Sequence, residues 1–135
     1  MKVKIEHENA TFWTKGTGII YCELTNPDSR RKLDKRTAEA YLKSVSQLSI
    51  GHPMPLHVDL RKAKGTFSIE AAQLLTYELY ENNLINCESF LVDSLSIHPV
   101  IQAYKKVFKS EISYGIFKST QKAHDFCESF LALNN

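Results

Sequence analysis

Residues 56–75, LHVDLRKAKGTFSIEAAQLL, constrain the fold of this chain more than any other segment. The segment begins with alternating apolar and polar residues, with Leu56, Val58 and Leu60 on one side, which is typical of a β-strand. A basic loop containing a glycine follows, and Ser68 is then a suitable N-cap for an amphipathic helix. Strand-to-helix turns of this kind lie at one edge of an α/β sheet, where ligands usually bind.

The same alternation of strand and helix patterns continues along the chain. We predict strands at 3–6, 10–14, 19–24, 55–60, 90–93 and 112–117. We predict four helices: one capped by Asp34 and ended by 51–53, one from Ser68 to 82–83, one opening at 96–99, and one capped by Ser119. Alternation from residue 19 onward favours parallel strands with right-handed crossovers, while the first two strands add an antiparallel edge. The predicted fold is one α/β domain over residues 1–135, with a mixed six-stranded sheet and an antiparallel N-terminal edge.

Composition limits the classes of function. Hydrophobic residues make up 43% and charged residues 24%, which is ordinary for a globular protein. The net charge is only +2, so nothing general favours nucleic acid or an anionic membrane as a partner. The N-terminus lacks the apolar run of a signal peptide, and no window is long and apolar enough for a membrane span. We expect a soluble, cytoplasmic protein.

Three cysteines, Cys22, Cys87 and Cys127, are widely spaced and include no CxxC pair. A disulfide framework or a zinc site needs other spacings, so we expect three reduced thiols. Cys127 falls at helical spacing among the apolar residues of the last predicted helix. We therefore expect it in the core rather than as a nucleophile.

Three segments together resemble a known superfamily: residues 56–75, residues 89–108 (SFLVDSLSIHPVIQAYKKVF) and residues 112–131 (ISYGIFKSTQKAHDFCESFL). They are similar to the STAS superfamily, and more closely to its SpoIIAA-like branch, which includes the bacterial anti-sigma-factor antagonists. The resemblance implies a SpoIIAA-like sandwich and a non-enzymatic regulatory or ligand-binding role.

In those antagonists an aspartate ends the strand, and a phosphorylatable serine followed by glycine begins the next helix. Asp59 matches the aspartate. By counting, the serine position falls on Ile69, with Ser68 one residue earlier and Glu70 in place of glycine. We therefore expect Ser68 to be a helix cap rather than a phosphorylation site.

Positive charge gathers in two segments, which we name the first basic loop (28–36) and the second basic loop (61–68). Parallel strands would bring both to one sheet edge, together with residues 96–98, and such an edge suits an anion or an acidic protein surface. The alternative, that these are solvated side chains offset by Asp28 and Asp34, stays open. The candidate binding residues are Arg30, Arg31, Arg61, Lys62, Lys64, Ser68 and His98.

Signatures of catalysis are missing from the sequence. A G-x-S-x-G elbow, a Walker A or Rossmann loop and a His pair at i, i+4 are all absent, so we expect no catalytic residue, metal or cofactor. The predicted function is a non-enzymatic regulatory or interaction module that binds an acidic protein through its basic edge. The alternative is a receptor or carrier for a small anionic metabolite or lipid. A homodimer could form through Tyr77, Tyr80 and Leu84.

Overall fold

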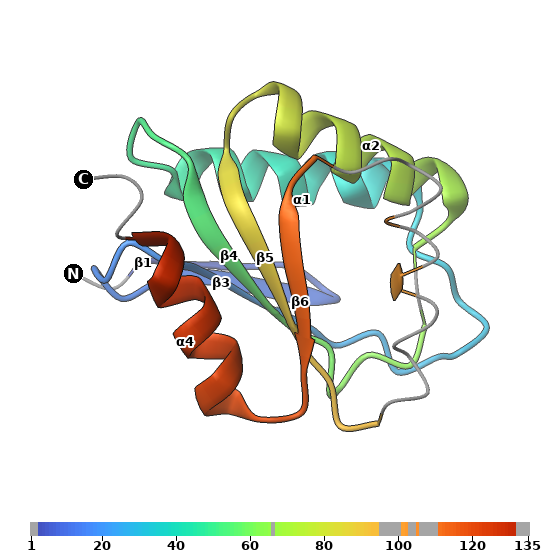
Figure 1. The fold of residues 1–135 in the computed structure, drawn as a ribbon. Coiled ribbons are helices and arrows are strands. Elements are labelled where there is room, and N and C mark those ends of the chain that lie inside the picture. Colours follow the sequence, from blue (N-terminus) through green and yellow to red (C-terminus); the bar gives the residue numbers. More distant parts are fainter. Residues whose placement is uncertain (1–2, 66, 95–100, 103–104, 106–110, 132–135) are drawn as a thin grey trace.

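One six-stranded sheet organises the molecule (Figure 1). The computed structural model describes the chain except for residues 1–2, 66, 95–100, 103–104, 106–110 and 132–135. The strands are β1 (Val3–Glu6), β2 (Ala10–Thr14), β3 (Ile20–Leu24), β4 (Met54–Asp59), β5 (Ile85–Leu91) and β6 (Ser113–Phe117). The helices within the described residues are α1 (Lys35–Leu48), α2 (Ile69–Glu81) and α4 (Thr120–Leu131).

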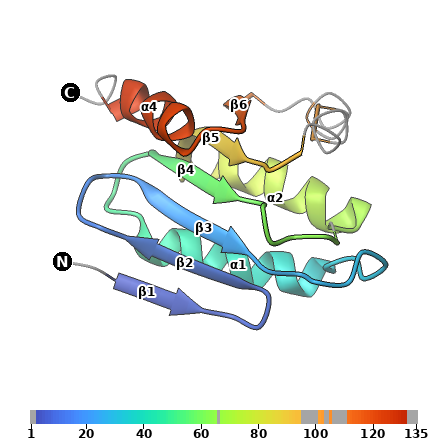
Figure 2. The ribbon, with the colours of Figure 1, turned by 90° about the horizontal axis from the view of Figure 1, so that it is seen from below.

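The order of strands across the sheet follows the order in the chain, from β1 to β6. The pairs β1–β2 and β2–β3 are antiparallel, whereas β3–β4, β4–β5 and β5–β6 are parallel. This confirms the predicted mixed sheet with an antiparallel N-terminal edge. Helices α1 and α2 cover one face and α4 covers the other (Figures 1 and 2). In the described part of the chain, no helix has the length and apolar character needed to cross a membrane.

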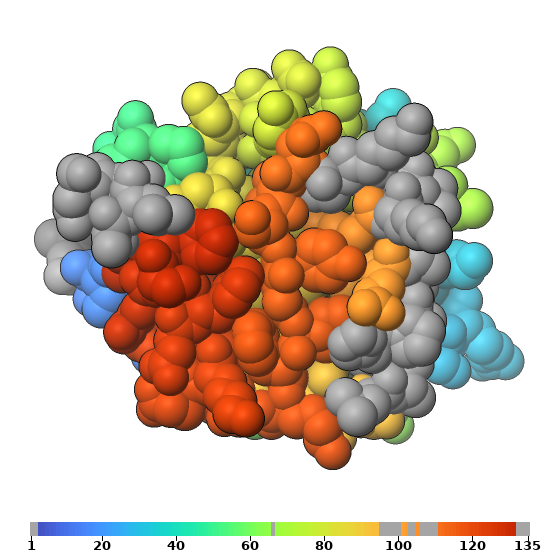
Figure 3. Space-filling model, in the orientation of Figure 1, coloured from blue at the N-terminus to red at the C-terminus, as the bar shows by residue number. Residues whose placement is uncertain are grey.

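Two apolar clusters lie on opposite faces of the sheet because side chains alternate along each strand. The larger cluster packs under α1 and α2 and includes Ile20, Leu56 and Val58. The smaller one lies under α4 and includes Tyr21 and Cys127. All six residues of β4 are buried, as expected for a strand covered on both faces. On the α4 side, that helix and β6 form one continuous surface (Figure 3).

Side-chain caps begin the three described helices, as predicted. The Asp34 carboxylate accepts a hydrogen bond from the Thr37 backbone N–H (2.9 Å). The Ser68 hydroxyl accepts one from the Ala71 N–H (3.1 Å). Ser119 accepts a longer one from the first turn of α4. Each such cap stabilises its helix by about 1 kcal/mol, so these residues fix where the helices begin.

Two sequence predictions differ from the structure. The strand predicted at 90–93 is β5, which begins earlier, at Ile85. Polar residues hide this start in the sequence, since Asn86, Glu88 and Ser89 interrupt the apolar run although Glu88 and Ser89 are buried. Most of the helix predicted to open at 96–99 lies outside the described residues; residues 101, 102 and 105 of it are described and are helical.

Gly65, in the second basic loop, lies against the backbone of the first basic loop and against Asn26, which precedes that loop. Its backbone N–H and that of Lys64 donate hydrogen bonds to the Asn26 carbonyl (3.3 and 2.7 Å). A Cβ on Gly65 would lie 2.1 Å from Asn26 Nδ2 and 2.4 Å from the carbonyl oxygens of Asp28 and Arg31. Only glycine fits this position without a shift of the backbone.

We expect Gly65→Ala to destabilise the fold more than Gly51→Ala. The Cβ added by Gly65→Ala would clash with backbone carbonyl oxygens. Gly51, in contrast, has a φ of +96° and open space around its Cβ position. Gly51→Ala therefore costs only backbone strain, about 1 kcal/mol. Urea unfolding of both variants measures the order, and equal losses of stability would contradict it.

Candidate functional site

The two basic loops lie side by side at the carboxyl ends of β3 and β4, as predicted. A parallel bridge joins Leu33 in the first loop to Phe67 in the second. The Ser68 N–H donates to the Leu33 carbonyl at 2.9 Å, and the contacts with Asn26 described above add a second link. His98 and the third predicted segment, 96–98, lie outside the described residues.

Four of the predicted basic residues already have acidic partners within the chain. Two of these partners are Glu8, in the turn between β1 and β2, and Glu23, on β3. The sequence alone did not predict that these two carboxylates lie at this edge. The pairs are Arg30 with Asp28 (3.6 Å), Arg31 with Glu8 (3.6 Å), Arg61 with Asp59 (2.8 Å) and Lys62 with Glu23 (3.7 Å). The edge therefore carries less excess positive charge than its sequence suggests.

The pair between Asp59 and Arg61 has the best geometry of the four. Arg61 donates to the carboxylate through Nε (3.0 Å), Nη2 (2.8 Å) and its backbone N–H (3.0 Å). Burial alone would raise the pKa of Asp59, but the hydrogen bonds and charge of Arg61 outweigh it and hold that pKa below its usual value. This pair thus fixes the start of the second basic loop.

Ser68 and Ile69 lie at the start of α2, beside the start of α1. The Ser68 hydroxyl is engaged as a cap. Ile69, at the position of the antagonists' serine, is 65% exposed, which is unusual for an isoleucine. It contributes to a shallow depression lined by Lys32, Asp34, Lys35, Arg36, Ser68, Ile69 and Glu70.

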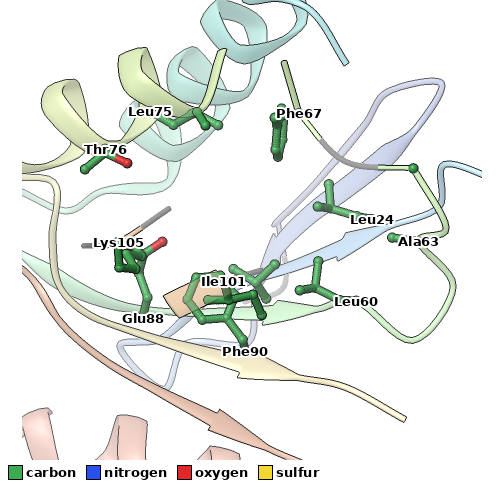
Figure 4. A pocket seen from close by; sticks show the side chains of 13 residues that line it. Leu24, Leu60, Ala63, Phe67, Leu75, Thr76, Glu88, Phe90, Ile101 and Lys105 are labelled. Carbon is green, nitrogen blue, oxygen red and sulfur yellow. The ribbon is translucent and has the colours of Figure 1, made fainter. Parts of the chain in front are cut away.

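An apolar pocket of about 160 Å³ lies beneath the second basic loop (Figure 4). Its walls come from the carboxyl-terminal parts of β3, β4 and β5, from α2, and from the loop itself. The residues that line it are Leu24, Val58, Leu60, Ala63, Gly65, Phe67, Ala72, Leu75, Thr76, Glu88, Phe90, Ile101 and Lys105. Sequence reasoning missed this pocket because no motif marks it and its walls are distant in the chain.

Glu88 and Lys105 form an ion pair in the wall of this pocket (Figure 4). Their side chains are only 8% and 9% exposed. The Lys105 ammonium also lies 5.5 Å from the centre of the Phe90 ring and 5.8 Å from that of Tyr114, which adds cation–π attraction. No signal in the sequence indicated this pair, because Glu88 lay outside the predicted strand.

One group among the described residues could approach a metal ion: His124, Asp125 and Glu128 on α4. Both ring nitrogens of His124 are already engaged, since Nδ1 lies 3.0 Å from Glu128 and Nε2 lies 3.1 Å from the Tyr21 hydroxyl. These contacts account for the cluster without a metal.

Comparison with known proteins confirms the SpoIIAA-like fold. A family model described as a domain of unknown function (DUF7793) matches residues 12–131. A solved structure of an uncharacterised DUF3478-family protein from Shewanella loihica PV-4, with a SpoIIAA-like fold, is similar to this chain with a TM-score of 0.58. The two are 10% identical, over 94% of this chain and 92% of that one, so the likeness concerns the fold. None of the curated proteins matches the sequence.

We expect Lys105→Met to lower the free energy of unfolding by about 3 kcal/mol, because it leaves the buried Glu88 without its partner. The double variant Glu88→Leu, Lys105→Met should recover most of this loss, since two apolar side chains then replace the ion pair. Chemical denaturation of both variants measures the difference. A double variant no more stable than the single one would contradict the expectation.

We expect Arg61→Gln to cost about 1 kcal/mol at neutral pH, because Asp59 loses hydrogen bonds to a charged donor that is itself half exposed. The folded-state pKa of Asp59 is depressed, so its contribution is present above the unfolded pKa, about 3.9, and is lost as pH falls through the folded value. The gap between wild type and variant should therefore shrink below about pH 4.

Urea unfolding at neutral and acidic pH measures this gap. Lys62→Gln is the matched control, since its pair with Glu23 is longer and more exposed and should contribute little at any pH. A gap for Arg61→Gln that does not change with pH would argue against the role of Asp59.

Proposed function

Since this chain belongs to the DUF7793 family, whose function is unknown, we propose a function from the geometry of its own site. We propose that it is a non-enzymatic binding module for a small anionic ligand whose apolar part enters the apolar pocket. The observation that carries this proposal is the position of the pocket. It lies at the carboxyl ends of parallel strands, where open α/β sheets usually bind ligands.

The size of the pocket limits what it can hold. Its volume of about 160 Å³ is close to that of an engineered apolar cavity, about 150 Å³, that binds benzene. An aromatic ring or a short acyl chain therefore fits, whereas a long lipid chain would need the pocket to open further. Burial of such a group contributes about 25 cal/mol per Å² of apolar surface removed from water.

The second basic loop gives the anionic end of the ligand a place to bind. Ala63, Gly65 and Phe67 of this loop line the pocket, and Arg61, Lys62 and Lys64 alternate with or precede them in sequence. The longer, more exposed pair of Lys62 with Glu23 contributes little on its own, so a ligand anion can replace Glu23 there at small cost. The first turn of α2 adds the positive end of a helix dipole nearby.

The Glu88–Lys105 pair also supports a ligand site. A buried ion pair is often no more stabilising than apolar residues of the same size, so it needs another reason to be present. Ligand pockets typically combine apolar walls with a few polar groups that orient the ligand. Here the pair supplies a donor and an acceptor to a pocket that is otherwise mainly apolar.

A second candidate function is an interaction module that binds a protein at the starts of α1 and α2. The observation that favours it is Ile69, an exposed apolar side chain in a depression that also contains Lys32, Lys35 and Arg36. A partner with an apolar residue among carboxylates would complement this surface. This candidate keeps the basic edge but does not use the pocket.

Thermal unfolding with a panel of arylcarboxylates and short-chain fatty acids tests the ligand proposal. A ligand at about 100 times its Kd should stabilise the protein by about 2.7 kcal/mol, a shift in Tm of several degrees. Ala72→Phe should abolish the shift because the added ring fills the pocket from α2. Gln73→Phe, on an exposed position of the same helix, is the matched control and should retain the shift.

The outcomes separate the two candidates. A saturable shift that is equal in both phenylalanine variants would place the ligand outside the pocket and contradict the proposal. No shift with any ligand, together with a co-purified protein that is lost on Ile69→Asp and kept in Gln73→Phe, would favour the interaction module.

A further inference from the structure

A second group of polar and nucleophilic side chains lies on the opposite face of the sheet, under α4. Cys87 on β5 and Cys127 on α4 belong to the same small apolar cluster, and both are fully buried. Ser89 on β5 and His57 on β4 lie beside them and are also buried. None of these residues lines the apolar pocket, so the following inference does not depend on the proposed function.

Hydrogen bonds connect this group into a chain. His57 Nδ1 lies 2.8 Å from the Ser89 hydroxyl oxygen, and that oxygen lies 3.1 Å from Cys127 Sγ. The Cys87 thiol belongs to the same buried cluster as Cys127 and interacts with it electrostatically. The Ser89 hydroxyl can therefore donate to a thiolate on Cys127 while it accepts from His57 Nδ1. A hydrogen-bonded histidine and serine that end at a buried thiol exceed what apolar packing alone requires.

The surroundings favour ionisation of Cys127 over Cys87. The hydrogen bond from Cys87, together with those involving His57 and Ser89 and the charge of His57, lowers the pKa of Cys127 although burial opposes this. The same contact with Cys127 and burial raise the pKa of Cys87. Cys22, in the other apolar cluster, has its pKa raised by burial. One thiol of the three is thus prepared as a nucleophile, with a protonated thiol beside it.

We infer that Cys127 and Cys87 form a peroxide-sensitive dithiol, in which Cys127 reacts first and Cys87 resolves the product as a disulfide. The Cys127 thiolate attacks one oxygen of hydrogen peroxide, which breaks the O–O bond and gives Cys127 sulfenic acid and hydroxide. The hydroxide takes up the proton that the Cys127 thiol released on ionising and leaves as water. The Cys87 sulfur then attacks the Cys127 sulfur, and its proton leaves with the displaced hydroxide as a second water. Two thiols thus lose two electrons in total, and one peroxide is reduced to two waters.

Access to the buried thiols requires a local opening, and α4 is the element placed to provide it. Among the residues of α4, only Ala123 and Cys127 are fully buried. Phe126, Phe130 and Leu131 hold the helix through partly exposed packing, so it can separate from the sheet locally without global unfolding. In the oxidised protein the disulfide would join α4 to β5 and prevent that separation.

A metal site is the other chemistry that two cysteines and a histidine could serve. Within the described residues, the potential ligand atoms that lie within 4.8 Å of one another belong to His124, Asp125 and Glu128 on α4. His57, Cys87 and Cys127 do not form such a group. The three side chains therefore do not converge on one ion, which leaves thiol oxidation as the chemistry that their contacts support.

The test uses the full chain, fully reduced and then treated with a small excess of hydrogen peroxide. Non-reducing peptide mapping by mass spectrometry should identify a peptide pair linked through Cys87 and Cys127, with Cys22 unmodified. The Cys127 thiol should be consumed about tenfold faster than Cys22, because a larger fraction of it is thiolate. This measurement on the wild-type protein needs no variant to fold.

Variants then assign the two roles. Cys87→Ser should stop the reaction at Cys127 sulfenic acid, which dimedone traps, and Cys22→Ala, the matched control, should still form the disulfide. Oxidation of Cys22 as fast as Cys127 would overturn the inference. So would a disulfide that forms only between chains, or Cys127 that stays reduced while denatured protein is fully oxidised.

Discussion

The complete burial of β4 is the constraint on which the rest of this structure depends. A strand whose residues are all buried needs cover on both faces, and the chain provides it with α1 and α2 on one side and α4 on the other. Because side chains alternate, Leu56 and Val58 enter one core while His57 points into the other. The central strand thus supplies a wall of the apolar pocket and the histidine of the dithiol at once, and it keeps the two sites apart.

Polar groups are buried on both faces, and their contacts distinguish them from ordinary core residues. Glu88 points towards α2 and pairs with Lys105, whereas its neighbour Ser89 points towards α4 and contacts Cys127. Burying such groups costs free energy unless each finds a partner. These two successive residues of β5 each find a polar partner, on opposite faces of the sheet. This strand therefore carries the polar chemistry of both faces, while β3 contributes mainly apolar packing.

The sequence predicted the framework well because its signals are local. Asp34, Ser68 and Ser119 are helix caps as expected, and the first two strands have the predicted bounds. The start of β5 was missed because a pattern of alternating apolar residues cannot identify a buried Glu88 or Ser89 as part of a strand. Partners distant in the chain were equally hidden. Glu8 and Glu23 compensate Arg31 and Lys62, and only the folded sheet brings them together.

The agreement between strand order and chain order has a consequence for a molecule that is still being made. All six strands and the two helices of the other face precede α4 in the chain, so α4 is the last described element to be synthesised. Until residues 120–131 leave the ribosome, nothing from α4 covers His57, Ser89 or Cys87.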